Sequence, residues 1–171
     1  HAFDGCGSLA AITIPDSVTG IGDYAFYQCG GLKDLTIPDS VTDIGEWAFS
    51  GCSGITTVTM PDSVTSIGEH AFYNCSSLTS ITFAENSKLT SIGFCAFYGC
   101  NSLTNVTIGS SVASISTSAF ADCTYLEEIK FNATACADFA ADSSYIFKNA
   151  GQSGTGIRIT IGKNVTKIPA Y

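Results

Sequence analysis

The stretch MPDSVTSIGEHAFYNC, residues 60–75, is the third copy of one pattern in this chain. IPDSVTGIGDYAFYQC occupies 14–29, and IPDSVTDIGEWAFSGC occupies 37–52. Ala-Phe pairs mark the same place in every copy, at Ala2/Phe3, Ala25/Phe26, Ala48/Phe49, Ala71/Phe72, Ala96/Phe97 and Ala119/Phe120. Successive pairs are separated by a step of 23, except that the step from Ala71 to Ala96 is 25. A fixed period of this length predicts a solenoid, in which each unit buries its apolar side against its neighbours.

Each unit reads L-x-x-I-x-I-P-D-S-V-x-x-I-G-x-x-A-F-x-x-C. The alternation in L-x-x-I-x-I predicts a short strand, which proline ends because it has no amide hydrogen to donate. The Val and Ile of V-x-x-I predict a second apolar wall, and the spacing of A-F-x-x-C predicts one turn of helix facing the core. A corner follows the second wall at Gly22, Gly45, Gly68 and Gly93, where glycine permits a positive φ; Ser116 holds this place in a later unit, so a positive φ is not required there.

The chain is expected to be a single domain of about seven such repeats. Regular repeats occupy 1–131, an irregular insertion occupies 132–156, and a final partial repeat occupies 157–171. ITIGKNVTKI at 159–168 matches VTIGSSVASI at 106–115 after a step of 53, which is seven more than two periods. Because both ends are pieces of the repeat, we interpret the chain as a fragment of a longer protein, so that any signal or anchor would lie outside it.

The combination of Pro-Asp-Ser-Val, Ile-Gly and Ala-Phe-x-x-Cys in one order resembles the BspA-like, or Treponema pallidum-type, leucine-rich repeat. The resemblance covers almost the whole chain, with 132–156 as the exception. It implies an α/β solenoid that is mostly β, a right-handed coil with a parallel sheet on its concave side and short helical turns on the other. The chain departs from the family pattern where the proline is replaced, at Ala84, Gly109 and Gly162.

The same resemblance implies a location and a kind of role. Members of the family are typically secreted or cell-surface proteins of bacteria and of some parasitic protists, and several act as adhesins toward host matrix proteins or other bacteria. The family supplies no catalytic residues and no shared ligand site that could be carried over to this sequence.

The charge of the chain argues against several classes of partner. Its formal net charge is −8, with 7 Lys and Arg against 15 Asp and Glu, so no basic stripe is available for nucleic acid or for an anionic membrane surface. No apolar run approaches the roughly 18 residues that span a bilayer, so we expect no membrane insertion in this segment. A partner would have to be neutral, basic or reached through uncharged contacts.

Reaction chemistry is not expected either. The two histidines, His1 and His70, stand in no pattern that would activate a Ser or Thr nucleophile, and no glycine-rich phosphate loop occurs. Without a C-x-x-C pair, zinc is not expected, and we predict neither a cofactor nor a metal. Two acidic columns leave calcium as an alternative to plain turn residues, at Asp16/Asp39/Asp62 and Asp23/Glu46/Glu69.

Six of the eight cysteines occupy one slot in successive units, which predicts a structural Cys ladder of buried, reduced thiols at Cys6, Cys29, Cys52, Cys75, Cys100 and Cys123. Parallel Cβ vectors in such a column give poor geometry for disulfide bonds. Cys95 is expected at the surface and Cys136 lies in the insertion, so a bridge between these two, or a reactive thiol, is the alternative.

Two surfaces are candidate binding sites. The first, which we call the strand face, consists of outward strand positions that are nearly uncharged, at Thr36, Thr59, Thr82, Thr107 and Lys130. It suits an extended polypeptide or a glycan, although outward Thr also reflects plain β-propensity. The second, the aromatic edge, is a row of rings with Tyr27 nearby, at Tyr24, Trp47, His70, Tyr73 and Tyr98. These rings suit protein or sugar contacts, or they simply shield the corners of the coil.

We therefore expect a non-catalytic protein-binding or adhesion module of a secreted or cell-surface bacterial protein, with a protein or glycan on a host or neighbouring cell as partner. One alternative is a structural spacer that projects another domain, and another is a substrate-holding arm of a larger secreted enzyme. Both ends present an apolar coil, so end-to-end self-association is also expected.

Overall fold

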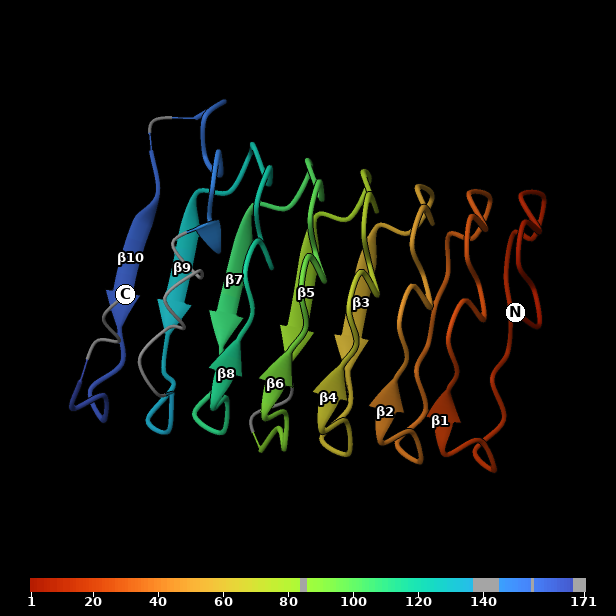
Figure 1. Ribbon diagram of the computed structural model, residues 1–171, viewed down its shortest axis with the longest axis horizontal. Helices are drawn as coiled ribbons and strands as arrows, with labels where there is room; N and C mark the ends of the chain where they lie inside the picture. The colour runs from red at the N-terminus through yellow and green to blue at the C-terminus, as the bar shows by residue number, and fades with distance from the viewer. Residues whose placement is uncertain (84–85, 137–144, 155, 168–171) are drawn as a thin grey trace.

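The computed structural model describes residues 1–83, 86–136, 145–154 and 156–167. Successive coils stand side by side along the long axis of the molecule, with the N-terminus at one end and the last strand at the other (Figure 1). The predicted departure at Ala84 and much of the predicted insertion, including 137–144, lie outside the described residues.

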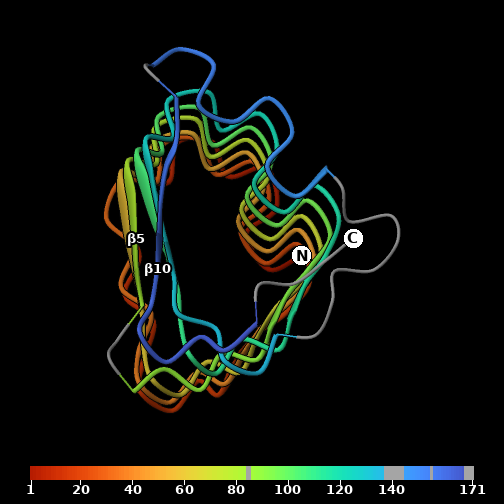
Figure 2. The same cartoon turned by 90° about the vertical axis from the view of Figure 1, so that its left-hand side faces the viewer.

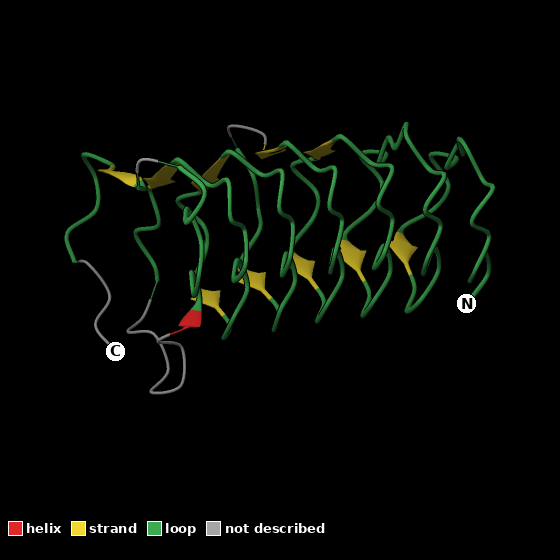
Figure 3. Ribbon diagram, turned by 90° about the horizontal axis from the view of Figure 1, so that it is seen from above, coloured by secondary structure: helices red, strands yellow, loops and turns green. Residues whose placement is uncertain are grey.

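The coils form two parallel sheets on opposite walls (Figure 3). The long-strand sheet has the order β10-β9-β7-β5-β3, and the short-strand sheet has the order β1-β2-β4-β6-β8. The long strands are β3 Thr57–Met60, β5 Ser80–Phe83, β7 Asn105–Ile108, β9 Glu128–Phe131 and β10 Arg158–Ile161. The short strands are β1 Gly20–Ile21, β2 Asp43–Ile44, β4 Ser66–Ile67, β6 Ser91–Ile92 and β8 Ser114–Ile115. The result is a mostly-β solenoid whose regular pairing extends over about five turns.

The sequence alternation explains the long-strand sheet. In β3 the side chains of Val58 and Met60 are buried and those of Thr57 and Thr59 are exposed. The register of β3 on β5 pairs Val58 with Ile81 and keeps apolar residues on the inner side of the sheet. Viewed along the stack, the coils superimpose in a closed loop, with β5 and β10 on one wall (Figure 2).

The predicted one-turn helices are not confirmed: the described Ala-Phe-x-x-Cys segments consist of turns, and the only helical residue among those described is Tyr145, just before Ile146. The amides of Ala25, Tyr27 and Cys29 bond back to carbonyls three residues earlier, each at 3.2 Å. Between them, the amides of Phe26 and Gln28 donate to the next coil at 2.8 and 2.7 Å. Because every second amide is used between coils, the segment is a ladder of turns, and it cannot have the hydrogen bonding of an α-helix.

The positive φ that glycine permits at the Ile-Gly corner is not adopted there. Positive φ occurs at two other places in each turn, one residue before the Ala-Phe pair and two residues after it. The first place holds Tyr24, Trp47, His70, Cys95 and Ser118, and the second holds Gly5, Gln28, Gly51, Asn74, Gly99, Asp122 and Asn149. The second set consists largely of the residue types that tolerate a left-handed backbone, namely Gly, Asn and Asp.

The glycine of Ile-Gly is needed for a different reason, which is close contact between backbones. A Cβ added at Gly68 would lie 2.7 Å from the carbonyl carbon of Gly45 in the preceding coil. At Gly93 the corresponding distance to Gly68 is 2.6 Å. Successive coils therefore approach each other here more closely than a side chain would allow.

The core is a continuous column of stacked rings and aliphatic side chains. Phe49, Phe72, Phe97 and Phe120 are fully buried, and the centroids of neighbouring Phe rings are 5.1 to 5.5 Å apart along the column. The column extends beyond the regular Ala-Phe pairs, because the ring of Phe147 stacks on that of Phe120 at 5.5 Å.

Phe147 shows that the predicted insertion is not one continuous block. The step from Phe120 to Phe147 is 27, where the regular step is 23. The step from Phe147 to Ile159 of β10 is 12, whereas the step from Phe120 to Ile129 of β9 is nine. The extra residues are therefore divided between the two sides of Phe147. The sequence signal was the Ile146-Phe147-x-x-Ala150 motif, a variant of Ala-Phe-x-x-Cys.

Hydroxyl groups link the coils on the outside of the core. Ser40 and Ser63, the serines of Pro-Asp-Ser-Val, donate to the carbonyls of Val18 and Val41 in the preceding coil, both at 2.6 Å. A column of threonines makes similar bonds, at Thr42, Thr65 and Thr90, with oxygen–oxygen distances of 3.0 to 3.2 Å. The recurrence of Ser and Thr in the motif is thus explained by bonds between coils, which stiffen the stack.

Candidate functional site

The structure brings the residues of the strand face together as one row across the long-strand sheet. Thr59 pairs with Thr82, and Lys130 pairs with Thr107 on one side and Thr160 on the other. Thr82 and Lys130 are exposed, whereas Thr107 is half-buried. Thr36 is also exposed, in the coil that precedes β3. The only charged group of the predicted set, the Lys130 ammonium, lies 3.7 Å from the carboxylate of Glu128.

A polar cleft of about 480 Å³ adjoins this row, and the sequence analysis did not identify it. It lies where the chain enters β7, β9 and β10, and it is lined by Thr104, Asn105, Glu127, Glu128, Gly156, Ile157 and Arg158. The alternation pattern could only indicate that such positions face outward. The cleft gives the C-terminal part of the strand face a mixed-charge border.

The rings of the aromatic edge form two neighbouring stacked rows. The ring of Trp47 lies nearly parallel to those of Tyr24 and His70, with centroid distances of 6.1 and 3.9 Å. Tyr73 and Tyr98 make a second stacked pair at 5.0 Å. All five rings are half-buried; neighbouring rings cover both faces of Tyr24 and of Trp47, and the Nδ1 edge of His70 is buried.

Trp47 joins the two rows of rings. Ser50 stands where Tyr27, Tyr73 and Tyr98 stand in other coils, and it is buried with 3% of its surface exposed. The centroid of the Trp47 ring lies 6.2 Å from that of Tyr27 and 5.7 Å from that of Tyr73. Trp47 is therefore next to the tyrosines on both sides of Ser50.

Phe94 is a residue of this surface that the sequence analysis missed. It stands in the column of Asp23, Glu46 and Glu69, and the motif gave no reason to expect a ring there. Its ring meets that of His70 edge-on at 5.1 Å, and 39% of the residue is exposed.

The environment of His70 favours the neutral imidazole. Burial lowers the pKa of His70, and the nearby Glu69 carboxylate offsets this only partly. The buried Nδ1 has no hydrogen-bond partner among the described residues.

A polar chain borders the second row of rings. The hydroxyl of Tyr98 donates to the Asp122 carboxylate, which also accepts a bond of 2.7 Å from the Asn149 amide. The hydrogen bond to Asp122 is the main reason that the pKa of Tyr98 rises to about 12, and the same bond lowers the pKa of Asp122.

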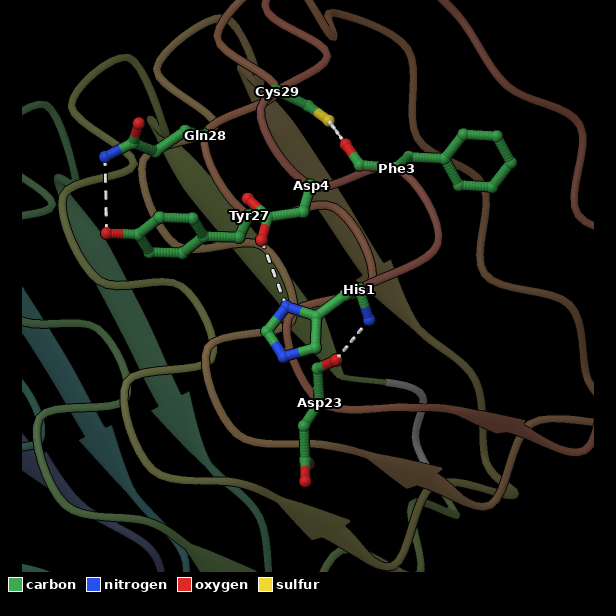
Figure 4. A network of polar contacts seen from close by, with 7 residues as sticks. All are labelled: His1, Phe3, Asp4, Asp23, Tyr27, Gln28 and Cys29. Carbon is green, nitrogen blue, oxygen red and sulfur yellow. Dashed lines mark hydrogen bonds and ion pairs between the residues drawn. The ribbon is translucent and has the colours of Figure 1, made fainter.

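The N-terminal residues make a network of polar contacts with the following coil (Figure 4). The terminal ammonium of His1 donates to the backbone carbonyl of Asp23 at 3.0 Å, and its imidazole pairs with Asp4, also at 3.0 Å. The His1 ring stacks on Tyr24 at 4.6 Å, so the outer face of Tyr24 is covered as well.

The structure places five of the six ladder cysteines in one file in the core, while Cys6 is exposed in the terminal coil. Each buried thiol donates to the carbonyl of a Phe in the preceding coil; for Cys52 and Cys75 the sulfur–oxygen distances are 3.0 and 3.2 Å. Burial raises the pKa of Cys52 and of Cys123 to about 12, and it raises those of Cys75 and Cys100 well above the usual value. These thiols are therefore poor nucleophiles in the folded chain.

Cys95 differs from its predicted surface position, because only 6% of it is exposed. It occupies a position where other coils have an aromatic ring, and its small apolar side chain is buried between neighbouring residues. Cys95 and Cys136 are both free thiols, so the alternative of a bridge between them is not supported.

One member of the acidic columns, Asp23, is used within the coil ladder. The Asp23 carboxylate accepts the Glu46 amide of the next coil at 2.8 Å. In the short-strand sheet Asp43 accepts bonds from Thr42, Ser66 and Thr65, which lower its pKa. Within the described part of the chain, no group of three or more His, Cys, Asp or Glu side chains is arranged to hold a metal ion. The described residues also include no helix of the length and hydrophobicity required to cross a membrane.

Two parallel sheets, a stacked core and hydroxyl ladders define a leucine-rich solenoid repeat protein. The family model described as the BspA type leucine rich repeat region, with six copies, matches residues 1–127 and 54–171. The chain belongs to this family, as the motif predicted. Proteins of the leucine-rich repeat family are typically non-catalytic repeat modules.

Solved structures of bacterial proteins show the same fold. A Treponema pallidum leucine-rich repeat protein is 34% identical with a TM-score of 0.67, over 71% of this chain and 58% of that one. A leucine-rich cell surface protein of Faecalibacterium prausnitzii is 34% identical with a TM-score of 0.54, over 72% of this chain and 39% of that one. A Bacteroides ovatus leucine-rich repeat protein is 26% identical with a TM-score of 0.55, over 94% of this chain and 56% of that one. This chain thus spans 58% and 39% of the length of the first two proteins. A comparison with curated proteins found no match.

Proposed function

We propose that this chain is a non-catalytic recognition module of a secreted or surface-attached bacterial protein, and that it binds a partner protein through the strand face. In this proposal the array comprises about seven coils, and the partner lies across them as an extended polypeptide. The partner belongs to a host matrix or to the surface of a neighbouring cell.

The observation that carries the proposal is the row of threonines and Lys130 at one register of the long-strand sheet, in which Thr59, Thr82 and Lys130 are exposed. Threonine hydroxyls at fixed intervals of about 4.8 Å can donate and accept hydrogen bonds along an extended chain. The row is nearly uncharged, so desolvating it on binding costs less than desolvating a charged surface. The core and the hydroxyl ladders hold these side chains in place, which reduces the entropy lost on binding.

The comparisons with solved structures support the extracellular location in this proposal. The similar protein from Faecalibacterium prausnitzii is a cell surface protein, and leucine-rich repeats of this type occur in such proteins. A module that presents a repeated, rigid surface outside the cell is suited to many weak contacts with another protein.

The test replaces Thr82 and Thr107 with Glu and measures binding to a panel of purified extracellular-matrix proteins by surface plasmon resonance. The matched control replaces Ser91 and Ser114 with Glu, because these residues belong to the same two coils but to the opposite wall. We expect the first variant to lose at least about tenfold in affinity, because two carboxylates are placed within the contact, and the control to bind normally. Equal loss in both variants, with both folded by circular dichroism, would remove the strand face as the binding surface.

A structural spacer is the second candidate, and the continuous hydroxyl and Cys ladders favour it because they stiffen the rod. A spacer predicts no binding to any matrix protein in the panel, even for the unmodified chain. It also predicts that a longer protein keeps its activity when the repeats are exchanged for another rigid array of equal length.

A further inference from the structure

The aromatic edge has features of a second binding surface. We propose that the aromatic edge is a second interaction surface that accepts a cationic segment of a polypeptide, rich in Lys or Arg. This inference does not depend on the strand face. It rests on three observations, namely the backbone conformation of the rings, their covered faces and the acidic row beside them.

The first observation is that the rings occupy a costly backbone position. Tyr24, Trp47 and His70 have φ values of 55°, 57° and 55°, in the left-handed region that bulky residues such as Tyr and Trp rarely adopt. Ser118 occupies the same place in a later coil, so the fold does not require an aromatic ring there. Each left-handed residue other than Gly costs on the order of 1 kcal/mol. Three consecutive rings at such a place point to a functional use.

The second observation is that the stack hides the faces of the rings. Trp47 lies 3.9 Å from His70 and 6.1 Å from Tyr24 in nearly parallel geometry, and Tyr24 is also covered by His1. A sugar ring binds aromatic residues mainly through their faces, so this stack offers it little surface. The exposed parts of the half-buried rings and the tyrosine hydroxyls instead suit the methylene stems and backbone of a polypeptide.

The third observation is the acidic row Asp23, Glu46 and Glu69, which immediately precedes Tyr24, Trp47 and His70 in the chain. All three acidic residues are exposed, and they take no part in the ion pairs His1–Asp4 and Lys130–Glu128. Strand repeats of about 4.8 Å set three carboxylates over roughly 10 Å. Cations two residues apart on an extended chain are roughly 7 Å apart, so two of them fit along the row. The charge of the row thus complements Lys or Arg, with the long stems of these side chains lying over the rings.

The test uses the fluorescence of Trp47, which is the single tryptophan of the chain and lies within the proposed site. The probe is a short synthetic peptide of alternating lysine and threonine, and a peptide of alternating glutamate and threonine is the control. We expect a saturable change in Trp47 fluorescence with the lysine peptide only. Because the charges are exposed, added salt should weaken the binding.

Two charge variants with the same net charge locate the site. Replacing Glu46 and Glu69 with Gln should weaken binding about tenfold, because two exposed ion pairs are lost. Replacing Asp16 and Asp39, which are exposed in the Pro-Asp-Ser turns, with Asn should change the affinity less than about twofold. Equal weakening by both variants would overturn the proposal, since it would show attraction by net charge alone.

A ring variant tests the aromatic contribution. Tyr73→Ser reproduces the residue that the chain already has at the same place as Ser50, so it preserves a natural form of the coil. We expect roughly fivefold weaker binding of the lysine peptide, with the fold retained by circular dichroism and the melting temperature lowered only by the lost stacking on Tyr98. Unchanged affinity, or a Trp47 response to a neutral maltooligosaccharide alone, would contradict a polypeptide site at the aromatic edge.

The two proposed surfaces fail independently. Thr82→Glu with Thr107→Glu should leave the lysine-peptide titration unchanged, and loss of the titration in that variant would overturn the aromatic edge as the site. Failure of every matrix protein to bind would count against the strand face and leave the peptide result as it stands.

Discussion

Adding one methyl group at Gly68 should destabilise the solenoid, whereas the same change at Gly22 should not. A Cβ at Gly68 would lie 2.7 Å from the carbonyl carbon of Gly45 and 2.8 Å from the amide nitrogen of Glu46. These atoms belong to the backbone, so they cannot turn away as the end of a side chain can. A Cβ at Gly22, the same motif position, would meet nothing within 4 Å, and Gly22 has no positive φ.

The two substitutions should change the free energy of unfolding in opposite directions. Overpacking of this kind costs about 1–3 kcal/mol, and Ser116 at the same place of a later coil shows that the stack can shift to admit a Cβ. Gly22→Ala should be neutral or stabilise the chain by about 0.4–1 kcal/mol, because alanine restricts the unfolded chain. Gly68→Ala is thus expected to lower the free energy of unfolding by about 2 kcal/mol relative to the unmodified protein.

Urea denaturation followed by circular dichroism measures this difference. With a slope of about 2 kcal/mol per molar urea, the Gly68→Ala midpoint should fall by roughly 1 M, while the Gly22→Ala midpoint stays or rises slightly. If the two variants shifted equally, the coils would not be in backbone contact at Gly68, and the stacking geometry would be refuted.

Three further results are expected. Iodoacetamide should label Cys6 in the folded chain but Cys75 only after unfolding, as detected by mass spectrometry. The reason is that Cys75 is buried and has a raised pKa. Rapid labelling of Cys75 in the folded chain would contradict a closed core. Asp122→Asn should lower the pKa of Tyr98 from about 12 toward its usual value, as a shift in the ultraviolet tyrosinate titration, and an unchanged curve would show that the bond is absent. An NMR titration should give a pKa of His70 below its ordinary value. The free energy of unfolding should therefore decrease as the pH is lowered below about 6.5. A normal or raised pKa would contradict the burial of His70.

The sequence predicted the repeat, the inward residues and the order of the coils, because these depend on spacing along one chain. Leu, Ile and Val at the predicted positions are buried, and the regular step of 23 reappears in the registers of Gly20 with Asp43 and of Thr57 with Ser80. The step of 25 around 83–89 reappears as the pairing of Ser80 with Asn105. The column position of Phe147 was missed because Ile and Ala replace the expected Ala and Cys beside it.

The errors have a common physical origin in contacts between coils. The spacing of Ala-Phe-x-x-Cys fits a helical turn, yet the amides of Phe26 and Gln28 are donated to the next coil, and a single unit gives no sign of that acceptor. The glycine of Ile-Gly suggested a special φ, but its role is to admit a neighbouring backbone. The aromatic edge was predicted as a row, whereas Phe94 joins it from another column and Cys95 withdraws from it into the interior.

By itself, then, the amino-acid sequence determined the period, the side of each strand that is buried and the family, because all three are written as regular distances between residue types. The tertiary structure alone decided which groups meet across neighbouring coils. These contacts between coils determine the left-handed backbone at Tyr24 and Trp47, the covered faces of the rings and the hydrogen bonds donated by the core thiols. They could not be derived from one repeat, since each depends on the distance to a coil that is one full repeat away in the chain and only about 5 Å away in space.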